Sequence, residues 1–181
     1  MELDRLLPPL AGEDHRCESC DYSYPETTIE AAADLIAAMP QRYADEIAAT
    51  TLADLRTRPD EQTWSVLEYL CHVRDVYSSG MIRLFRIRSE ERPAFEPMLA
   101  DLRAVRFRYN ELDPHPVLRE LELHVGGFLD EVAHVDDWDR VATRLPTEER
   151  TAAWLVRHLA HEGLHHRHDI ARVRSAVTVR S

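Results

Sequence analysis

The sequence predicts an all-α protein, a four-helix bundle with a long crossover connection and an irregular N-terminal arm. Two observations lead to this prediction. Apolar residues recur at helical spacing in four long segments, and no segment alternates convincingly between apolar and polar residues as a half-buried strand does. Four helices of roughly 20 residues with one long connection match the arrangement of many helical bundles. The 181 residues are enough for one such domain.

The N-terminal arm is expected to comprise residues 1–26, which are rich in Pro, Asp and Glu, and the bundle residues 27–175. The arm contains Cys17 and Cys20 in a Cys-x-x-Cys motif that follows His15. Two thiolates are half of a zinc site, and the sequence has no second Cys-x-x-Cys to complete it. A dithiol switch and a surface zinc knuckle completed by His15 are both open interpretations. We expect no metal here, and one metal per chain in total.

The first helix of the bundle is predicted to start at Thr27 and Glu30, which have the spacing of a capping box. Apolar residues then recur at helical spacing up to Met39. Pro40 lacks a backbone N–H donor and clashes with the preceding turn. We therefore expect it to kink the helix or to split it from residues 41–50.

The second helix is predicted to start at a capping box formed by Ser65 and Glu68, and its apolar positions continue to Phe85. Residues 89–114 contain Pro93 and Pro97 and several arginines. This composition indicates a crossover connection, with a short helix at about residues 98–107.

The third helix is predicted to start at Asp113 and Pro114, because aspartate caps helices and proline suits their first turn. Residues 136–147 are expected to form a loop. The fourth helix, residues 151–173, contains five of the ten histidines of the chain. This concentration makes it the first place to look for a metal site.

Two pairs of potential metal ligands compete on the fourth helix. At about 100° per residue, Glu162 and His166 lie at the edges of the apolar sector, whereas His161, His165 and His168 are expected to face water. Residues four apart on a helix can offer two donor atoms to one metal. The alternative interpretation is that Glu162 and His166 hydrogen-bond each other or the backbone. Only this pair faces the core, where an unsatisfied polar group is costly.

A third ligand is suggested on the second helix, where His72 lies between Glu68 and Asp75. Periodicity alone would place His72 on the surface. However, the run from Trp64 to Asp75 resembles the W-S-x-x-E-x-x-x-H-x-x-D signature of the DinB-like superfamily. These proteins are four-helix metal-binding bundles that include bacterial thiol S-transferases.

The fourth helix resembles the H-x-x-H/E-x-x-x-H-x-x-Q/D-I ending of the same superfamily. Aligned on Asp169 and Ile170, the resemblance implies His72, Glu162 and His166 as metal ligands, and it covers roughly residues 17–173. Most relatives have histidine at the position of Glu162. Glutamate there resembles the mycothiol-dependent maleylpyruvate isomerase branch, which binds zinc through His, Glu and His.

The resemblance implies a metal-dependent transferase or isomerase that joins a low-molecular-weight thiol to a small electrophile. Mycothiol is the first candidate for this thiol. Zinc is the first choice of metal, and nickel and iron also suit this ligand set. One alternative is a non-catalytic metal-binding stress-response bundle. Another is a metal-dependent hydrolase, in which Glu68 or Asp75 would be the catalytic base for a water molecule. The crossover contains Arg103, Arg106 and Arg108. These three arginines and Arg83 either bind an anionic substrate or are solvated surface charges.

Composition excludes several other classes of function. The formal net charge of −11, without a basic stripe, disfavours nucleic-acid binding. All 22 basic residues are arginines, so a Schiff-base lysine is excluded. We find neither a membrane span nor a secretory signal in the sequence and expect a cytoplasmic protein. By analogy with relatives we expect a homodimer that pairs through the apolar third helix, which light scattering would test.

Overall fold

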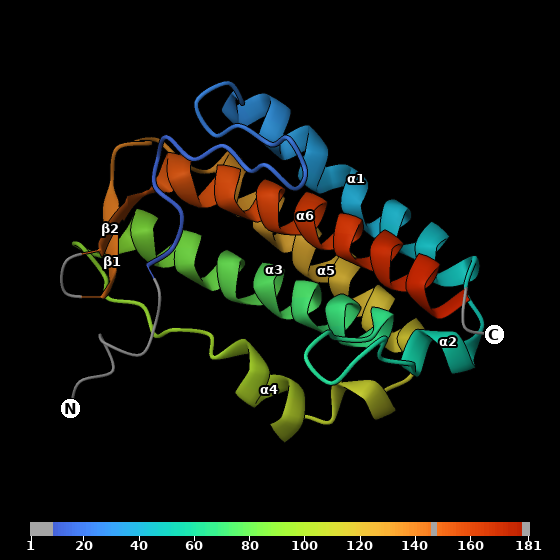
Figure 1. The fold of residues 1–181 in the computed structure, drawn as a ribbon. Helices are drawn as coiled ribbons and strands as arrows, with labels where there is room; N and C mark the ends of the chain where they lie inside the picture. Colours follow the sequence, from blue (N-terminus) through green and yellow to red (C-terminus); the bar gives the residue numbers. More distant parts are fainter. Residues whose placement is uncertain (1–8, 146–147, 179–181) are drawn as a thin grey trace.

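Four long helices pack side by side in the computed structural model, which describes residues 9–145 and 148–178 (Figure 1). They are α1 (Ile29–Ala48), α3 (Val66–Ser89), α5 (Pro114–Ala133) and α6 (Ala152–Thr178). Helices α3 and α1 each contact both α5 and α6, so the four helices close into a bundle around one core. The prediction of an all-α four-helix bundle is confirmed. Within the described residues, no helix is long and apolar enough to cross a membrane.

The connections contain short elements. Helix α2 (Leu52–Arg56) follows α1, and the crossover between α3 and α5 contains α4 (Ala100–Arg106) and the 3-10 helix η2 (Tyr109–Glu111). The crossover and its short helix thus agree with the sequence analysis. Helix α2 was not predicted, because five residues are too few to show helical periodicity.

The loop predicted for residues 136–147 is partly wrong, because the chain forms an antiparallel hairpin of β1 (Val141–Leu145) and β2 (Glu148–Thr151). The crossover supports this hairpin from its other side. The N–H of Thr143 donates to the carbonyl of Pro93 at 2.9 Å, and the N–H of Phe95 donates to the carbonyl of Thr143 at 2.7 Å. Strands of four or five residues owe their stability to such partners. The sequence of one strand therefore carries little signal.

Helix starts follow the local sequence closely. The hydroxyl of Ser65 accepts from the N–H of Glu68 at 3.2 Å, and the Glu68 carboxylate accepts from the N–H of Ser65 at 2.9 Å, which completes the predicted capping box. Asp113 caps α5 as predicted. At α1, however, the cap is Thr28 and not Thr27, whose hydroxyl donates to the carbonyl of Ser23.

Helix α1 also continues through Pro40, so the expected split does not occur. The apolar stripe of the helix is buried on both sides of the proline, at Ile36, Met39, Tyr43 and Ile47. Packing of this stripe against α5 and α6 offsets the lost backbone hydrogen bond.

The N-terminal arm, residues 9–28, runs along α6 (blue trace in Figure 1). The indole of Trp154 donates to the carbonyl of Ala11 at 3.0 Å, and Arg157 donates to the carbonyl of Thr27 at 2.8 Å. Tyr24 is completely buried. The arm is irregular, as predicted, yet its side chains belong to the same core as those of the bundle.

The close approach of α3 and α6 gives a first testable prediction. A Cβ atom at Gly80 would lie 2.2 Å from Cδ2 of Leu159, a side chain that is itself buried. We expect Gly80→Ala to lower the free energy of unfolding by about 1–3 kcal/mol, measured by urea denaturation. Gly126→Ala on α5 is the matched control, because nothing lies within 4 Å of its Cβ position. It should stabilise by up to ~1 kcal/mol. Equal effects in both variants would contradict the close approach.

Candidate metal centre

Three potential metal ligands come together from two helices. His72 on α3 and Glu162 and His166 on α6 each offer one donor atom, and these atoms lie within 4.8 Å of one another. Oε2 of Glu162 is 3.8 Å from Nε2 of His72 and 3.5 Å from Nε2 of His166. Tetrahedral coordination by nitrogen and oxygen places ligand atoms about 3.3–3.6 Å apart. The separation to His166 lies in this range and the separation to His72 slightly above it, so the three side chains could hold a single divalent metal ion.

The surroundings of the two histidines support this arrangement, through a hydrogen bond at His166 and through ring packing at His72. Nδ1 of His166 is 2.8 Å from Oδ2 of Asp169, which leaves Nε2 directed at Glu162. Metal-binding histidines commonly make such a hydrogen bond to a carboxylate, which sets the orientation of the ring. The ring of His72 packs edge-on against Trp64 and His166, with centroids 5.1 and 4.8 Å away. Both imidazoles are thus held in place before any metal binds.

The electrostatics of the site favour a cation. Burial alone would raise the pKa of Glu162, but His158, His166 and His72 lower it well below its usual value. Burial alone would lower the pKa of His166, but hydrogen bonds to Asp169 and Glu162 raise it to about 9. The two carboxylates thus hold a proton on His166 when no other positive charge is present. A divalent metal ion would supply that charge instead.

His72 and Glu162 also form part of the wall of a cavity of about 250 Å³. Three further titratable side chains line it: Arg83 of α3, Arg144 of β1 and His158 of α6. The remaining wall is mostly apolar and consists of Leu10, Val76, Ser79, Pro97, Met98, Leu99, Ala100 and Leu159. A candidate metal centre thus opens onto a small cavity with a cationic side.

Arg83 is the cation in this wall whose charge is least compensated. Its guanidinium donates to the carbonyl of Glu96 at 2.7 Å and lies over the ring of Phe95. In the part of the chain that the structure describes, no carboxylate lies within ion-pair distance of Arg83, whereas Arg144 pairs with Glu148 at 2.9 Å. Burial and the nearby Arg144 lower the pKa of Arg83. An anionic group bound in the cavity would compensate the charge of Arg83 and raise the pKa of its guanidinium again.

The comparison with protein families agrees with this architecture. A family model of the DinB superfamily matches residues 21–170. The chain belongs to the DinB superfamily. This match confirms the resemblance seen in the sequence.

The fold of this DinB protein is similar to that of YfiT from Bacillus subtilis, described as "a probable metal-dependent hydrolase with an unusual four-helix bundle topology". The TM-score is 0.72 and the sequence identity 18%, and the match covers 97% of this chain and 95% of YfiT. At this identity, the similarity is evidence for the fold alone. No curated protein matches the sequence at a significant level.

The two carboxylates considered as catalytic bases are engaged elsewhere in this DinB protein. Glu68 is buried and accepts from Arg58 at 2.7 Å in addition to its role in the capping box. Asp75 is buried and accepts from Arg103 at 2.6 and 2.9 Å, and also from Arg74 and the hydroxyl of Tyr109. Burial opposes both charges, but these donors lower the pKa of each carboxyl below its usual value. Neither residue lines the cavity that contains His72.

The arginines of the crossover do not converge on the metal centre. Arg103 pairs with Asp75, and Arg108 pairs with Glu111. Neither of them, nor Arg106, lines the cavity. Of the arginines that the sequence suggested for substrate binding, Arg83 is therefore the one beside the candidate ligands.

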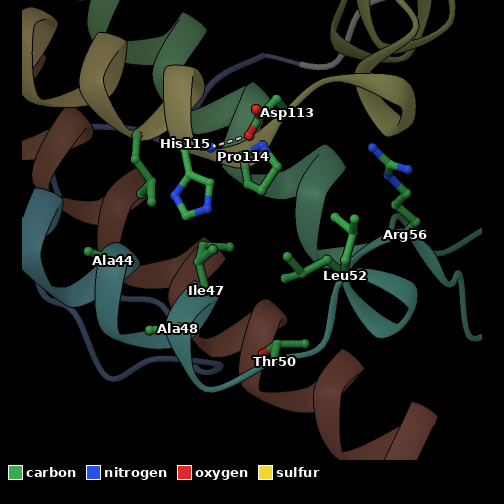
Figure 2. Close-up of a pocket in the computed structure, with 11 residues that line it drawn as sticks. Ala44, Ile47, Ala48, Thr50, Leu52, Arg56, Asp113, Pro114 and His115 are labelled. Atoms are coloured by element: carbon green, nitrogen blue, oxygen red, sulfur yellow. Dashed lines mark hydrogen bonds between the residues drawn. The ribbon is translucent and has the colours of Figure 1, made fainter.

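A second cavity of about 730 Å³ lies between α1, α2 and the start of α5 (Figure 2). Ile47, Leu52 and Pro114 give it an apolar wall. The charged side chains in its wall make structural contacts: Asp113 caps α5, and Arg56 donates to the carbonyl of Leu112. Although this cavity is larger, no candidate metal ligand lines it, so we place the functional site at the smaller one.

The prediction that His161 faces water is wrong, because the side chain is only 7% exposed. His165 is half-buried. The helical wheel placed them correctly on the face opposite the bundle core, but the N-terminal arm covers that face. Cys17 and Cys20 of the arm offer donor atoms within 4.8 Å of those of His161 and His165. The only signal in the sequence was the presence of two half-sites, a Cys-x-x-Cys and a His-x-x-x-His.

Proposed function

We propose that this protein is a metal-dependent transferase or isomerase that joins a low-molecular-weight thiol, with mycothiol as the first candidate, to a small anionic electrophile. The observation that carries the proposal is the shared cavity, in which His72 and Glu162 lie beside the uncompensated cation Arg83. A cavity of about 250 Å³ suits a small substrate. An arginine without a carboxylate partner favours a substrate with a carboxylate or similar anion.

A metal held by His72, Glu162 and His166 would supply Lewis acidity, which lowers the pKa of a bound thiol or water molecule. The cavity favours the thiol. Among the described residues that line it, the one carboxylate is Glu162, itself a proposed ligand. Hydrolysis commonly uses an additional carboxylate to take a proton from water, whereas a thiol is acidic enough to lose its proton without one.

His158 is the proposed acceptor of the thiol proton. Burial lowers its pKa, so the imidazole is neutral and can take up a proton. The hydroxyl of Tyr24, 3.0 Å from Nδ1, and the indole of Trp154, stacked at 4.4 Å, hold the ring in place. The thiol would lose its proton to His158, and its sulfur would form a bond to one carbon of an electron-poor C=C bond of the substrate. The π electrons of that bond would shift to the other carbon, which would take up the proton. In an isomerase, this carbon loses the proton again after rotation about the C–C single bond, the C–S bond breaks as the C=C bond re-forms, and the thiol is regenerated.

A metal-dependent hydrolase is the second candidate, in which the neutral His158 would take a proton from water in place of a carboxylate. YfiT, which has a similar fold, is described as a probable metal-dependent hydrolase. A non-catalytic metal-binding bundle is the third. The three candidates differ in what they consume, so one set of assays separates them.

The test uses protein reconstituted with zinc, nickel or iron(II) and measures free mycothiol and substrate against a panel of carboxylate-bearing electrophiles. We expect metal-dependent modification of the electrophile that requires the thiol. In an isomerase the thiol is not used up, so the product must be followed as well. Substrate cleavage without any thiol would favour the hydrolase. Bound metal without turnover of either kind would leave only a stabilising role.

Arg83 provides a prediction for substrate binding. Arg83→Gln should raise the KM for an anionic substrate by roughly 10- to 100-fold, as expected for the loss of a charged hydrogen bond. A neutral analogue should be little affected. The matched control is Arg86→Gln, one turn further along α3, because Arg86 contacts the same Phe95 ring but pairs with Glu90 and does not line the cavity. Equal effects of both variants would argue against Arg83 as the anion-binding residue.

A further inference from the structure

A second group of potential metal ligands lies where the N-terminal arm meets α6. Cys17 and Cys20 come from the arm, and His161 and His165 come from two successive turns of the helix. Their four donor atoms all lie within 4.8 Å of one another, and all but His165 are buried. Both cysteines are free thiols. None of these residues belongs to the set formed by His72, Glu162 and His166.

The arm presents its two sulfurs in a tight turn. Asp21 adopts a left-handed conformation with φ of 58°, which reverses the chain directly after Cys20. The N–H of Cys17 donates to the carbonyl of Tyr22 at 2.9 Å, which closes the turn. The turn therefore brings the two sulfurs together beside the helix, within 4.8 Å of each other.

His161 shows an unfulfilled interaction. Its Nδ1 is 3.1 Å from the hydroxyl of Tyr24, whereas its Nε2 is buried and has no hydrogen-bond partner among the described residues. An unsatisfied polar atom in the interior is costly, so such atoms are rare. A metal ion bound to Nε2 would remove this cost, and the hydrogen bond at Nδ1 would orient the ring for it.

In His165 the two ring nitrogens have the opposite roles, because Nδ1 faces the cysteines and Nε2 faces a supporting side chain. Its Nδ1 is 3.4 Å from the sulfur of Cys17, close to the separation of about 3.5 Å that sulfur and nitrogen have in a tetrahedral zinc site. Its Nε2 is 3.6 Å from Oδ2 of Asp169. Asp169 thus faces both His165 and His166 and supports one histidine of each candidate site.

We propose that Cys17, Cys20, His161 and His165 bind a structural zinc ion that fastens the N-terminal arm to α6. Two thiolates and two neutral imidazoles balance the charge of Zn²⁺, so the buried complex is neutral overall. Four protein ligands complete a tetrahedral site, which is the pattern of structural zinc, whereas the set at His72 has three. This proposal replaces the expectation of one metal per chain and the suggested role of His15.

The zinc would also hold one wall of the cavity in place. Leu10 of the arm lines the cavity, and its N–H donates to Glu148 at 3.3 Å. Cys17 and His165 are 148 positions apart in the sequence, so a metal bound to both closes a long loop. Such a cross-link reduces the conformational entropy of the unfolded chain. The site thus links the stability of the arm to the shape of the cavity, without depending on the reaction proposed above.

The test measures metal content and spectra of the full chain, purified under reducing conditions. With excess zinc, we expect two ions per wild-type chain, and one in either Cys17→Ser/Cys20→Ser or His72→Ala/His166→Ala. When cobalt(II) replaces zinc, the His72→Ala/His166→Ala variant should keep the intense thiolate-to-cobalt charge-transfer absorption. The Cys17→Ser/Cys20→Ser variant should lose it. Cys71→Ala is the matched control, because Cys71 is buried in α3 outside both sets and its loss should leave the spectrum unchanged.

A cobalt-loaded wild-type protein without thiolate-to-cobalt absorption would overturn the proposal. This measurement uses the wild-type chain, so it decides the question even if a cysteine variant fails to fold. It does not measure turnover. A protein that binds two metals but transfers no thiol would therefore refute the proposed function and leave the structural zinc site intact.

Discussion

His166→Ala is expected to remove the metal ion held with His72 and Glu162 and to lower the melting temperature. A ligand that binds only the folded state stabilises it by mass action, by about 4 kcal/mol at a concentration a thousand times its Kd. For a chain of this size, that corresponds to a melting temperature lower by roughly 8–16 °C in the presence of zinc. Metal analysis and differential scanning calorimetry at saturating zinc would measure the two effects.

Two further variants sharpen this experiment. His168→Ala is the control on the same helix, because His168 belongs to neither ligand set. The metal content of this variant should stay at the wild-type value. Glu162→His should also retain the metal, since an imidazole nitrogen can replace the carboxylate oxygen as a ligand, but it should change the activity by altering the charge of the site. A metal content of His166→Ala equal to that of the wild type would show that the site has been misplaced.

Asp75→Ala is expected to destabilise the protein without removing the metal. The buried carboxylate joins Arg103, Arg74 and the hydroxyl of Tyr109, and thereby connects α3 to α4 and η2. Removing the carboxylate leaves its donors without this acceptor. Because Arg103 is 39% exposed and Arg74 keeps Glu120 as a partner, we expect a loss of about 1.5–3 kcal/mol, the contribution of a hydrogen bond to a charged group. Urea denaturation of the zinc-loaded protein would measure it.

The pH dependence of this effect has a definite sign. The pKa of Asp75 is lower in the folded protein than the ordinary 3.8, because its donors outweigh the effect of burial. Its stabilising contribution is therefore complete above pH 3.8 and is lost as the pH falls through the lower, folded-state pKa. The difference between wild type and Asp75→Ala should be constant near neutral pH and narrow in acid.

Glu120→Ala is the matched control for Asp75→Ala. It removes the partner of Arg74 at the surface, where Glu120 is about half exposed, and should cost less than about 1 kcal/mol. If Asp75→Ala kept its stability but lost turnover with the metal bound, Asp75 would be the catalytic base that the sequence suggested. The ion pairs around Asp75 favour the structural role.

The sequence alone was sufficient for the elements whose signals are local. Helical periodicity predicted the four long helices, and the caps at Ser65 and Asp113 predicted two of their starts, because a cap involves residues only two or three positions apart. The same reasoning placed Glu162 and His166 toward the core, since both lie on one helix. His72 required the resemblance to the DinB superfamily. The structure then brings the three together without testing whether they bind a metal.

Only the tertiary structure could decide what covers the other face of the last helix. A helical wheel compares the residues of one helix with each other and contains no information about a distant segment. His161 therefore looked like a surface residue, although the arm with Cys17 and Cys20 packs directly over it. The cavity depended in the same way on distant contacts, since its wall combines residues of the arm, α3, the crossover, β1 and α6. Such contacts arise from the packing of the whole chain and leave no periodic trace in any one of its segments.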